Sequence, residues 1–317
     1  MTPDASDSEM LMLRAAELYY HQNLTHAQIA EQLSTSRWTV GRLLERAREV
    51  GIVRITIQHP LARPHHLEVA LCETYGLREA IVVPRQTDAE ATADAVCSAA
   101  ADLLAALRPR PTSVGLSWGR TTSRVAGKLP QGWNRGVTVV QTNGGLAVGG
   151  VDLIGRSLRE MAERGPGQGR LLPAPTIVGS AELGRTLRQD PAVARTLQSA
   201  AAARVIVFSP GSATSTSVLV DSGYLTGEDV TRLTRQGVVG DVLSHFVDAD
   251  GAIVDADLDA RTISMPLESL RECPASIAVS TGTDKVEVTR AALTGRLCRT
   301  LITDAELAAA LLGVPAP

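Results

Sequence analysis

The sequence predicts an α/β protein, with an N-terminal winged helix-turn-helix followed by a larger domain built on a doubly wound, mostly parallel sheet. Two observations lead to this prediction. From residue 65 onward, short apolar runs alternate with helical stretches, which is the pattern of parallel strands covered by helices on both faces. Before residue 60, three helical stretches follow one another across tight breaks. A chain of 317 residues is long enough for about two domains.

Composition excludes several classes of protein. The chain is 44% hydrophobic and 21% charged with a net charge of −3, as in ordinary globular proteins. Its four cysteines lie far apart and none has a neighbour at metal-ligand spacing, so we expect reduced thiols and no metal site. No apolar run approaches the roughly 20 residues of a membrane helix, and the acidic start "MTPDASDSEM" is unlike a secretory signal. We therefore expect a cytoplasmic protein without membrane contact.

The first two helices are predicted from periodicity and capping. An apolar stripe runs along residues 9–21, formed by Leu11, Leu13, Ala15, Ala16, Leu18 and Tyr19. Asn23 and Leu24 break this helix. Thr25 then stands at an N-cap position with Gln28 three residues later, a capping-box pattern that begins a short helix, "HAQIAEQL".

A third helix, "RWTVGRLLERAREV", is expected to begin after Ser36 and to end before Gly51. Its apolar residues recur on one face only: Val40, Leu43, Leu44, Ala47 and Val50. The other face is polar and basic. Two short helices joined by a tight turn, the second with such a face, are typical of a helix-turn-helix.

Side chains at the start of this third helix could donate hydrogen bonds to base edges and phosphates in the major groove. The candidate DNA-binding residues are Thr25, Ser36, Arg37, Trp38, Thr39 and Arg42. Five arginines and two glutamates between residues 37 and 54 give this stretch a local charge of +3. The alternative is a solvated surface of a helical bundle, on which Glu45 and Glu49 pair with neighbouring arginines.

The alternating run "IVRITI", residues 52–57, is predicted to be a strand or wing, and the proline-containing "QHPLARP" a linker. The predicted domains are therefore a DNA-binding domain over residues 1–57, a linker over 58–64, and an effector-binding and oligomerisation domain over 65–317.

Seven strands are predicted in the second domain, over residues 80–84, 113–116, 137–141, 204–208, 238–239, 276–280 and 297–302. Helices are predicted between them over residues 89–107, 121–129, 227–236, 285–293 and 304–312. Ligands of such sheets bind outside the carboxyl ends of the strands, so the loops at these ends are the candidate site.

The loop "SWGRTT" follows one strand and opens a helix, so that Gly119, Arg120, Thr121 and Thr122 could present backbone N–H groups and hydroxyls to an anion. The alternative is a plain glycine turn with a threonine cap. The loop "STGTDK" contains a glycine, Gly282, and places Lys285 at a helix start. The helix dipole disfavours a lysine there, which favours an anionic partner; the alternative is a solvated side chain.

Two further loops could bind hydroxyl groups. "QTNGG" offers Gln141 and Asn143, followed by Gly144 and Gly145, which would let a ligand approach closely. The alternative here is a type I′ Asn-Gly turn. "VGD" leaves Asp241 at the edge of a strand, able to accept from sugar hydroxyls or else to cap a turn.

Other motifs fail. "AGKLP" lacks the glycine and the hydroxyl residue of a phosphate-binding P-loop, and no G-x-G-x-x-G is present. "DADG" lacks the ligand pattern of a calcium loop. "FSPGSATSTS" contains no G-x-S-x-G nucleophile elbow. We therefore expect no cofactor, no metal and no catalytic residue.

Taken together, these residues resemble the SorC family of bacterial sugar-responsive transcription regulators over residues 9–313. The resemblance is densest in "SRWTVGRLLERAREVGIVRI", "VGLSWGRTTSRVAGKL", "GVVGDVLSHFVDADG" and "VSTGTDKVEVTRAALTGRLCRTLITD". It implies an effector domain similar to sugar-phosphate isomerases and deaminases. It also implies a homo-oligomer, a tetramer built from dimers, in which a phosphorylated sugar changes the affinity for double-stranded operator DNA.

Carried over by position, the resemblance implies that Gly119, Thr121, Thr122 and Lys285 hold the phosphate, and that Asp241, Gln141 and Asn143 face the sugar. The chain departs from the family at Trp38, where proline or a small polar residue is more common, and at Gly41, where serine is common. The operator sequence of other family members therefore cannot be assumed for this chain. In one family member, a lysine at the place of Asn143 forms a Schiff base with the ligand. An amide cannot do so, and we expect non-covalent binding.

Two functions remain open. A sugar-phosphate isomerase or deaminase fused to a helix-turn-helix needs a positioned acid or base, and only Asp241 could serve in these loops. The favoured prediction is a non-enzymatic regulator, a repressor of a carbohydrate catabolic operon, whose operator binding responds to the sugar phosphate.

Overall fold

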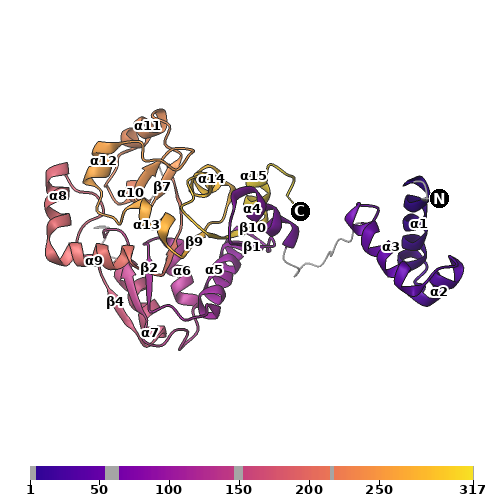
Figure 1. The fold of residues 1–317 in the computed structure, drawn as a ribbon. Helices are drawn as coiled ribbons and strands as arrows, with labels where there is room; N and C mark the ends of the chain where they lie inside the picture. Colours follow the sequence, from indigo (N-terminus) through magenta and orange to yellow (C-terminus); the bar gives the residue numbers. More distant parts are fainter. Residues whose placement is uncertain (1–4, 54–63, 146–152, 215–217, 317) are drawn as a thin grey trace. The chain divides into compact units, whose positions relative to one another are not determined.

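The computed structural model describes residues 5–53, 64–145, 153–214 and 218–316 (Figure 1). The chain divides into two compact units, residues 1–62 and 63–317. None of the helices in the described ranges combines the length and the apolar character that crossing a membrane requires.

The N-terminal unit consists of helices, and its predicted caps are confirmed. Helix α1 (Ala5–Ala16) continues as a π-helical turn η1 (Glu17–His21), and α2 (His26–Gln32) and α3 (Arg37–Glu49) follow. Thr25 Oγ1 accepts from the backbone N–H of Gln28, and Gln28 Oε1 accepts from the Thr25 N–H at 3.0 Å. Ser36 Oγ accepts from the Thr39 N–H at 3.0 Å. Ser36 is therefore the N-cap of α3, which begins at Arg37.

The three helices bury a small apolar core, formed by Ala15, Ala16, Leu18, Ile29, Ala30, Val40 and Leu44. The predicted stripes were partly wrong, because Leu11, Leu13, Tyr19 and Val50 are exposed while Met12 is buried. The predicted wing over 52–57 and linker over 58–64 lie outside the described residues, apart from positions 52, 53 and 64.

The C-terminal unit confirms the predicted parallel sheet. Its seven strands run in the spatial order β1-β10-β9-β5-β2-β3-β4, and every neighbouring pair is parallel. The strands are β1 (Glu79–Val83), β2 (Ser113–Leu116), β3 (Thr138–Gln141), β4 (Gln168–Arg170), β5 (Val205–Phe208), β9 (Ala275–Val279) and β10 (Thr300–Asp304). The chain moves outward from β2 to β4 and then returns to the other side of β2 with β5. The order therefore reverses between β2 and β5, the point at which open α/β sheets bind ligands.

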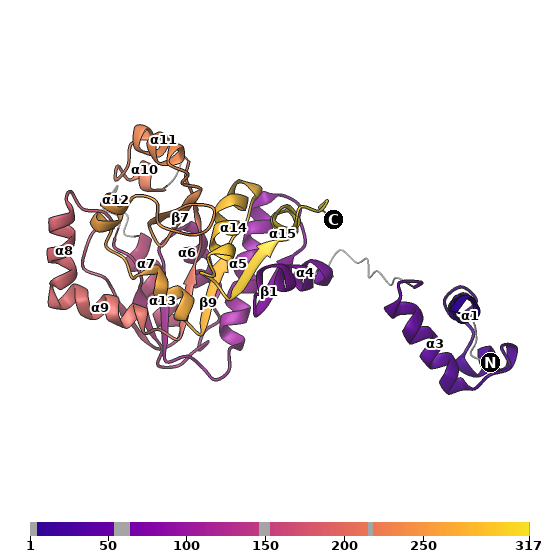
Figure 2. The same ribbon diagram turned by 45° about the horizontal axis from the view of Figure 1, so that its top comes forward.

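Helices cover both faces of this sheet, as predicted (Figures 1 and 2). One face packs against α5 (Ala89–Ala106), α6 (Arg120–Lys128) and α7 (Leu153–Arg164). The other packs against α4 (His65–Tyr75), α9 (Pro191–Ala201), α13 (Leu267–Glu272), α14 (Val286–Thr294) and α15 (Ala305–Leu312). Helix α8 (Ala181–Gln189) packs against α9. Each apolar strand thus has a core on both sides, which explains why the strands read as continuous hydrophobic runs.

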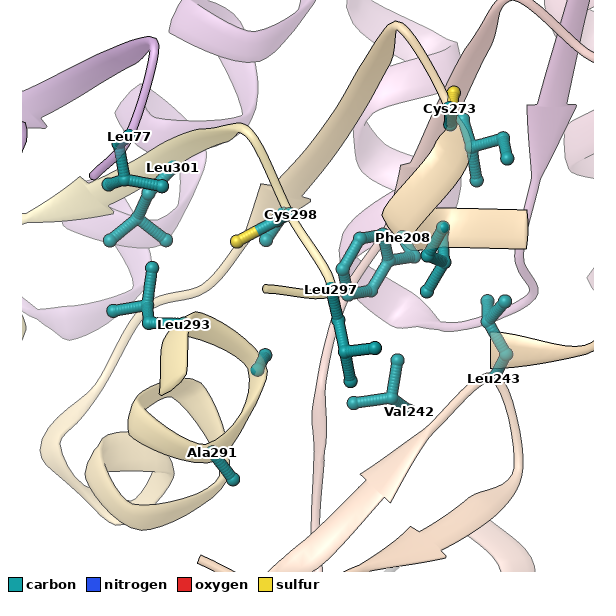
Figure 3. Close-up of a cluster of buried hydrophobic side chains, with 14 of the residues drawn as sticks. Leu77, Phe208, Val242, Leu243, Cys273, Ala291, Leu293, Leu297, Cys298 and Leu301 are labelled. Atoms are coloured by element: carbon teal, nitrogen blue, oxygen red, sulfur yellow. The ribbon is translucent and has the colours of Figure 1, made fainter. Parts of the chain in front are cut away.

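A second, antiparallel sheet of three strands lies at one end of this unit. It contains β6 (Gly211–Ser212), β7 (Gly240–Val242) and β8 (His245–Val247), in that order. Helices α10 (Val218–Asp221), α11 (Gly227–Arg235) and α12 (Ala256–Arg261) gather around it (Figures 1 and 2). Figure 3 shows how the two sheets are joined, since Phe208, Val242 and Leu297 belong to one buried cluster.

Two predicted strands were misplaced. The strand expected over 238–239 is β7, which begins at Gly240, because a hairpin with positive φ at Leu243 and Ser244 sets its register against β8. The strand expected over 297–302 begins only at Thr300. Leu297 is fully buried in the loop that precedes it, so its hydrophobicity reflects burial beneath the sheet rather than strand structure.

Candidate functional site

A cavity of about 160 Å³ opens where the order of the parallel strands reverses. Segments that directly follow β2 and β5 form two of its sides, and β7 and η2 (Thr283–Lys285) complete it. Its described lining residues are Ser117, Trp118, Gly119, Arg120, Thr121, Asn143, Ser209, Pro210, Gly211, Ser212, Thr214, Leu219, Asp241, Leu243, Asp284 and Lys285. The structure therefore brings together six of the predicted effector-binding residues.

The N-terminus of α6 faces this cavity without a side-chain cap. Gly119 occupies the N-cap position with φ +147, a conformation that residues with a side chain rarely adopt. Among the described hydrogen bonds, none engages the backbone N–H groups of Arg120 and Thr121. Uncapped N–H groups at a helix start, together with the helix dipole, attract an anion.

Two polar side-chain atoms beside this helix start are buried and have no partner in the described part of the chain. They are Ser117 Oγ and Trp118 Nε1, and Ser117 is only 4% exposed. Buried donors in native proteins almost always bond to something. Both residues line the cavity, so both polar groups are available to a molecule that binds there.

Lys285 supplies a positive charge to the same cavity. Its Nζ donates to Ser209 Oγ at 3.1 Å, so it is held against the loop that follows β5. Burial lowers the pKa of Lys285, the nearby charge of Arg120 lowers it further, and the carboxylates of Asp284 and Asp241 act in the opposite direction. An anionic ligand would relieve the cost of burying this ammonium group.

Asp241 reaches the cavity from β7, in the middle of the antiparallel sheet, and not from the edge of a strand as predicted. One carboxylate oxygen accepts from the Ser244 N–H at 2.9 Å. The other lies so close to Gly211 that a Cβ there would overlap it. Burial raises the pKa of Asp241 to about 6, against the Ser244 hydrogen bond and the charges of Lys285 and His245.

Asn143 is held in place by its neighbours. It is 2% exposed, its Nδ2 donates to Ser244 Oγ at 3.0 Å, and its Oδ1 accepts from Thr142 Oγ1 at 3.1 Å. Because an amide nitrogen carries two hydrogens, one N–H remains for a molecule in the cavity. The pair Asn143–Gly144 does not form a type I′ turn, since neither residue has a positive φ.

Two other residues expected to bind the effector have their polar groups engaged within the protein. Gln141 Nε2 donates to the Asn143 carbonyl at 2.7 Å, and its Oε1 accepts from the Leu172 N–H at 3.0 Å. Thr122 is fully buried and donates to the Gly119 carbonyl at 3.1 Å. Neither side chain lines the cavity, because neighbouring backbone has taken its hydrogen bonds.

The three remaining glycines also lie away from the cavity. A Cβ on Gly144 would stand 2.5 Å from the Pro175 carbonyl carbon and 2.7 Å from Thr176 Cα, so this glycine admits another part of the backbone and not a ligand. Gly145 bonds to the same segment, with its N–H donating to the Ala174 carbonyl at 2.8 Å. Gly282 lines a different cavity, and its N–H donates to Asp304 Oδ2 at 2.9 Å.

Sequence reasoning missed the loop after β5. Ser209, Gly211 and Ser212 all line the cavity, although "FSPGS" had been set aside because it contains no nucleophile elbow. The available signal was its position, because a serine- and glycine-containing segment directly follows a buried strand, as "SWGRTT" does.

Groups suited to catalysis are sparse around the cavity. His245 is buried elsewhere, with Nδ1 2.5 Å from Asp259 Oδ1 and Nε2 3.0 Å from the Met265 carbonyl. Within the described ranges, no cluster of histidine, cysteine or carboxylate side chains could hold a metal. Asp241 is therefore the one partly buried carboxylate among the described lining residues.

In the N-terminal unit, the predicted DNA-binding residues divide into two groups. Thr25 and Ser36 use their hydroxyls as helix caps, and Ser36 Oγ also lies 2.8 Å from Thr39 Oγ1. Arg37, Trp38 and Arg42 instead project from α3 and are exposed. The Arg42 guanidinium carbon lies 4.9 Å from the centroid of the Trp38 ring.

The alternative of a salt-bridged helical face is not what the structure shows. Across residues 37–53, no ion pair joins Glu45 or Glu49 to an arginine. The arginines of α3 thus keep their charge available to a partner.

Comparison with known proteins adds to this geometry. Residues 59–313 match the family described as "Putative sugar-binding domain". The deoxyribonucleoside regulator of Bacillus subtilis is 34% identical over 309 residues, which cover 96% of this chain and 98% of that protein. The transcriptional regulator LsrR of Escherichia coli is 29% identical over 311 residues, covering 96% and 95%. The full-length sorbitol operon regulator SorC from Klebsiella pneumoniae superposes with a TM-score of 0.74 at 28% identity, covering 97% of this chain and all of that one.

Proposed function

Because this chain belongs to the SorC family of sugar-responsive transcription regulators, we propose that it binds double-stranded operator DNA and that a phosphorylated sugar in the cavity changes its affinity for that DNA. The observation that carries the proposal is the cavity itself, with unsatisfied donors and a partly buried lysine around the uncapped start of α6.

One end of the cavity suits a phosphate group. The backbone N–H groups of Arg120 and Thr121, the Ser117 hydroxyl and the Lys285 ammonium are all donors, and all border the same space. A phosphate offers them three strongly accepting oxygens and a negative charge. Hydrogen bonds to a charged group contribute about 1.5–3 kcal/mol each, so the loss of one donor should be measurable.

The other groups suit the hydroxyls of a sugar. The Asp241 carboxylate accepts hydrogen bonds, Asn143 has one N–H to donate, and Ser209 and Ser212 can do either. Asn143 cannot form a Schiff base, which supports reversible, non-covalent binding.

Coupling to DNA requires two arrangements of the protein that differ in affinity for the sugar. The sugar phosphate then shifts DNA affinity by that difference, commonly about 1–3 kcal/mol. We propose a homo-oligomer, a dimer of dimers, whose paired α2–α3 units act as winged helix-turn-helix heads on half-sites about one helical turn or a multiple apart. Release of the operator by the sugar would make the protein a repressor.

An active sugar-phosphate isomerase or deaminase is the second candidate. Asp241 favours it, because a carboxylate whose pKa is about 6 could transfer protons near neutral pH. Against it, both ring nitrogens of His245 are hydrogen-bonded outside the cavity. Conversion of ribose 5-phosphate or glucosamine 6-phosphate by the purified protein at enzymatic rates would establish an enzyme. It would refute the proposal of a regulator that does not transform its ligand.

The phosphate site is tested by a matched pair of lysine variants, since Lys128 and Lys285 are the two lysines of the chain. Lys128 lies at the far end of α6 and pairs with Asp94 at 2.6 Å. A thermal-shift screen would compare three- to six-carbon sugar phosphates with the corresponding free sugars. We expect a sugar phosphate to stabilise the wild type and Lys128→Met, while Lys285→Met binds it about 10- to 150-fold more weakly.

Thr121→Val supplies an independent perturbation of the same end of the cavity. The proposal is contradicted if free sugars stabilise the wild type as well as their phosphates do. It is also contradicted if Lys285→Met responds like Lys128→Met.

A further inference from the structure

The side chain of Trp38 is largely exposed to solvent. It is 72% exposed, the highest fraction among the large apolar side chains in the described ranges. Trp38 is the second residue of α3, and Val40 and Leu44 bury the opposite face of this helix in the core. The indole therefore cannot turn inward, and it leaves an aromatic surface on the basic face of α3, where a partner can contact it.

Arg42 stands one helical turn after Trp38, on the same face of α3. Its guanidinium lies 4.9 Å from the indole centroid, within the distance of a cation–π interaction. No ion pair or hydrogen bond of Arg42 is recorded in the described part of the chain. Stacking on the ring restricts the guanidinium while leaving its five N–H donors available, which prepares it for a bidentate acceptor.

The charge around this pair favours a polyanion over a protein surface. Five arginines and two glutamates lie between residues 37 and 54, and the exposed side chains of Arg37 and Arg42 flank the indole. In the major groove, an arginine donates to both O6 and N7 of guanine, and an apolar group contacts the C5-methyl of thymine.

Resting on the DNA-binding function proposed above, we propose that Trp38 and Arg42 form one base-reading unit that determines operator specificity. Arg42 donates to a guanine, and Trp38 contacts the methyl group of a neighbouring thymine. The two groups lie 4.9 Å apart, which is between one and two times the rise of ~3.4 Å between successive base pairs and is enough to reach adjacent bases.

Selection from a random duplex pool by the full-length wild type identifies the site without knowledge of the operator. We expect the enriched sequence to contain a thymine next to a guanine in each half-site. In the selected duplex, uracil for that thymine removes only the methyl group, and 7-deazaguanine for that guanine removes only the N7 acceptor.

Four variants then assign each base to its side chain. We expect uracil to weaken wild-type binding about tenfold, to leave Trp38→Ala unaffected, and to weaken Trp38→Phe by an intermediate factor. We expect 7-deazaguanine to weaken the wild type about tenfold and to leave Arg42→Met unaffected, because methionine has no donor for N7. Arg46→Met, on the exposed side of the same helix, serves as the control and should respond to both bases like the wild type.

The outcomes separate this inference from the function on which it rests. Enrichment of a sequence without adjacent thymine and guanine, or equal uracil sensitivity of wild type and Trp38→Ala, would overturn the reading unit while leaving DNA binding intact. A wild type that enriches no duplex at low salt would refute DNA binding and the reading unit together. Because Trp38 is exposed, circular dichroism should show the same helix content for each variant.

Discussion

Asp241 is expected to destabilise the protein when the cavity is empty. Burial raises its pKa from the ordinary value of 3.8 to about 6. Each pKa unit corresponds to about 1.4 kcal/mol, so the charged carboxylate costs roughly 3 kcal/mol of folding free energy. Asp241→Asn removes the charge, keeps the shape of the side chain and retains an oxygen that can accept from the Ser244 N–H.

The sign of the effect follows from where the proton binds. The folded state holds the proton of Asp241 more tightly than the unfolded state, because its pKa in the folded state is higher. The favourable contribution of the protonated form is complete below pH 3.8 and is lost as pH rises through about 6. Asp241→Asn should therefore match the wild type near pH 4 and exceed its stability by up to roughly 3 kcal/mol above pH 7.

Urea unfolding of the wild type and Asp241→Asn between pH 4 and pH 8, followed by circular dichroism, measures this difference directly. Asp284→Asn is the control, since Asp284 lines the same cavity but is exposed. A pH-independent difference between wild type and Asp241→Asn, or a variant that is less stable at pH 7.5, would show that the buried charge of Asp241 does not destabilise the fold. A stability gain accompanied by loss of sugar-phosphate binding would identify Asp241 as a side chain kept for function.

Three further predictions concern other parts of the chain. Gly144→Ala forces a Cβ against the Pro175 backbone and should lower the free energy of unfolding by about 1–3 kcal/mol. Gly179→Ala is the control and should change this free energy little, because no atom lies within 4 Å of the added Cβ. Equal stabilities of the two variants in urea would contradict the packing argument. Borohydride reduction with a bound aldose phosphate should leave the wild type at its unmodified mass, and an adduct on Lys285 would disprove non-covalent binding. Arg37→Ala should reduce DNA affinity and the slope of its salt dependence while thermal stabilisation by the sugar phosphate stays intact; loss of both responses would mean that the variant is misfolded.

Local sequence signals were sufficient for most of the fold. The strand from Ser113 to Leu116 was predicted to the residue, because an apolar run bounded by turn residues leaves few alternatives. The Thr25–Gln28 cap was found for the same reason, since both partners lie within one helical turn. Leu297 misled the prediction because burial alone, without periodicity, does not distinguish a buried loop from a strand.

The site was harder to predict, because its geometry depends on contacts between distant segments. Gly119 and Lys285, which line the cavity, were selected from their places at strand ends and helix starts, which are local features. Gln141 does not line the cavity, and this could not be foreseen because its partner, Leu172, is 31 residues away in sequence. Gly144 was misjudged similarly, since the backbone that it admits belongs to Pro175.

The position of Asp241 within its strand also could not be predicted from local sequence. Its residue type and its role near a ligand could be proposed from "VGD", but the antiparallel sheet that holds it contains a strand of only two residues, β6. So short a strand leaves no hydrophobic pattern to detect. Ser209 and Gly211 went unrecognised because their position after β5 matters more than any motif that they form.

The most direct test of the account is thermodynamic reciprocity between the two units of the wild type. Fluorescence anisotropy with a selected duplex gives the DNA affinity with and without saturating sugar phosphate, and calorimetry gives the sugar-phosphate affinity with and without DNA. We expect each ligand to change the affinity of the other by the same factor, about 5- to 150-fold. We expect Lys285→Met to bind DNA with an affinity that does not respond to the sugar phosphate. A sugar phosphate that occupies the cavity and leaves DNA affinity unaltered would contradict the account.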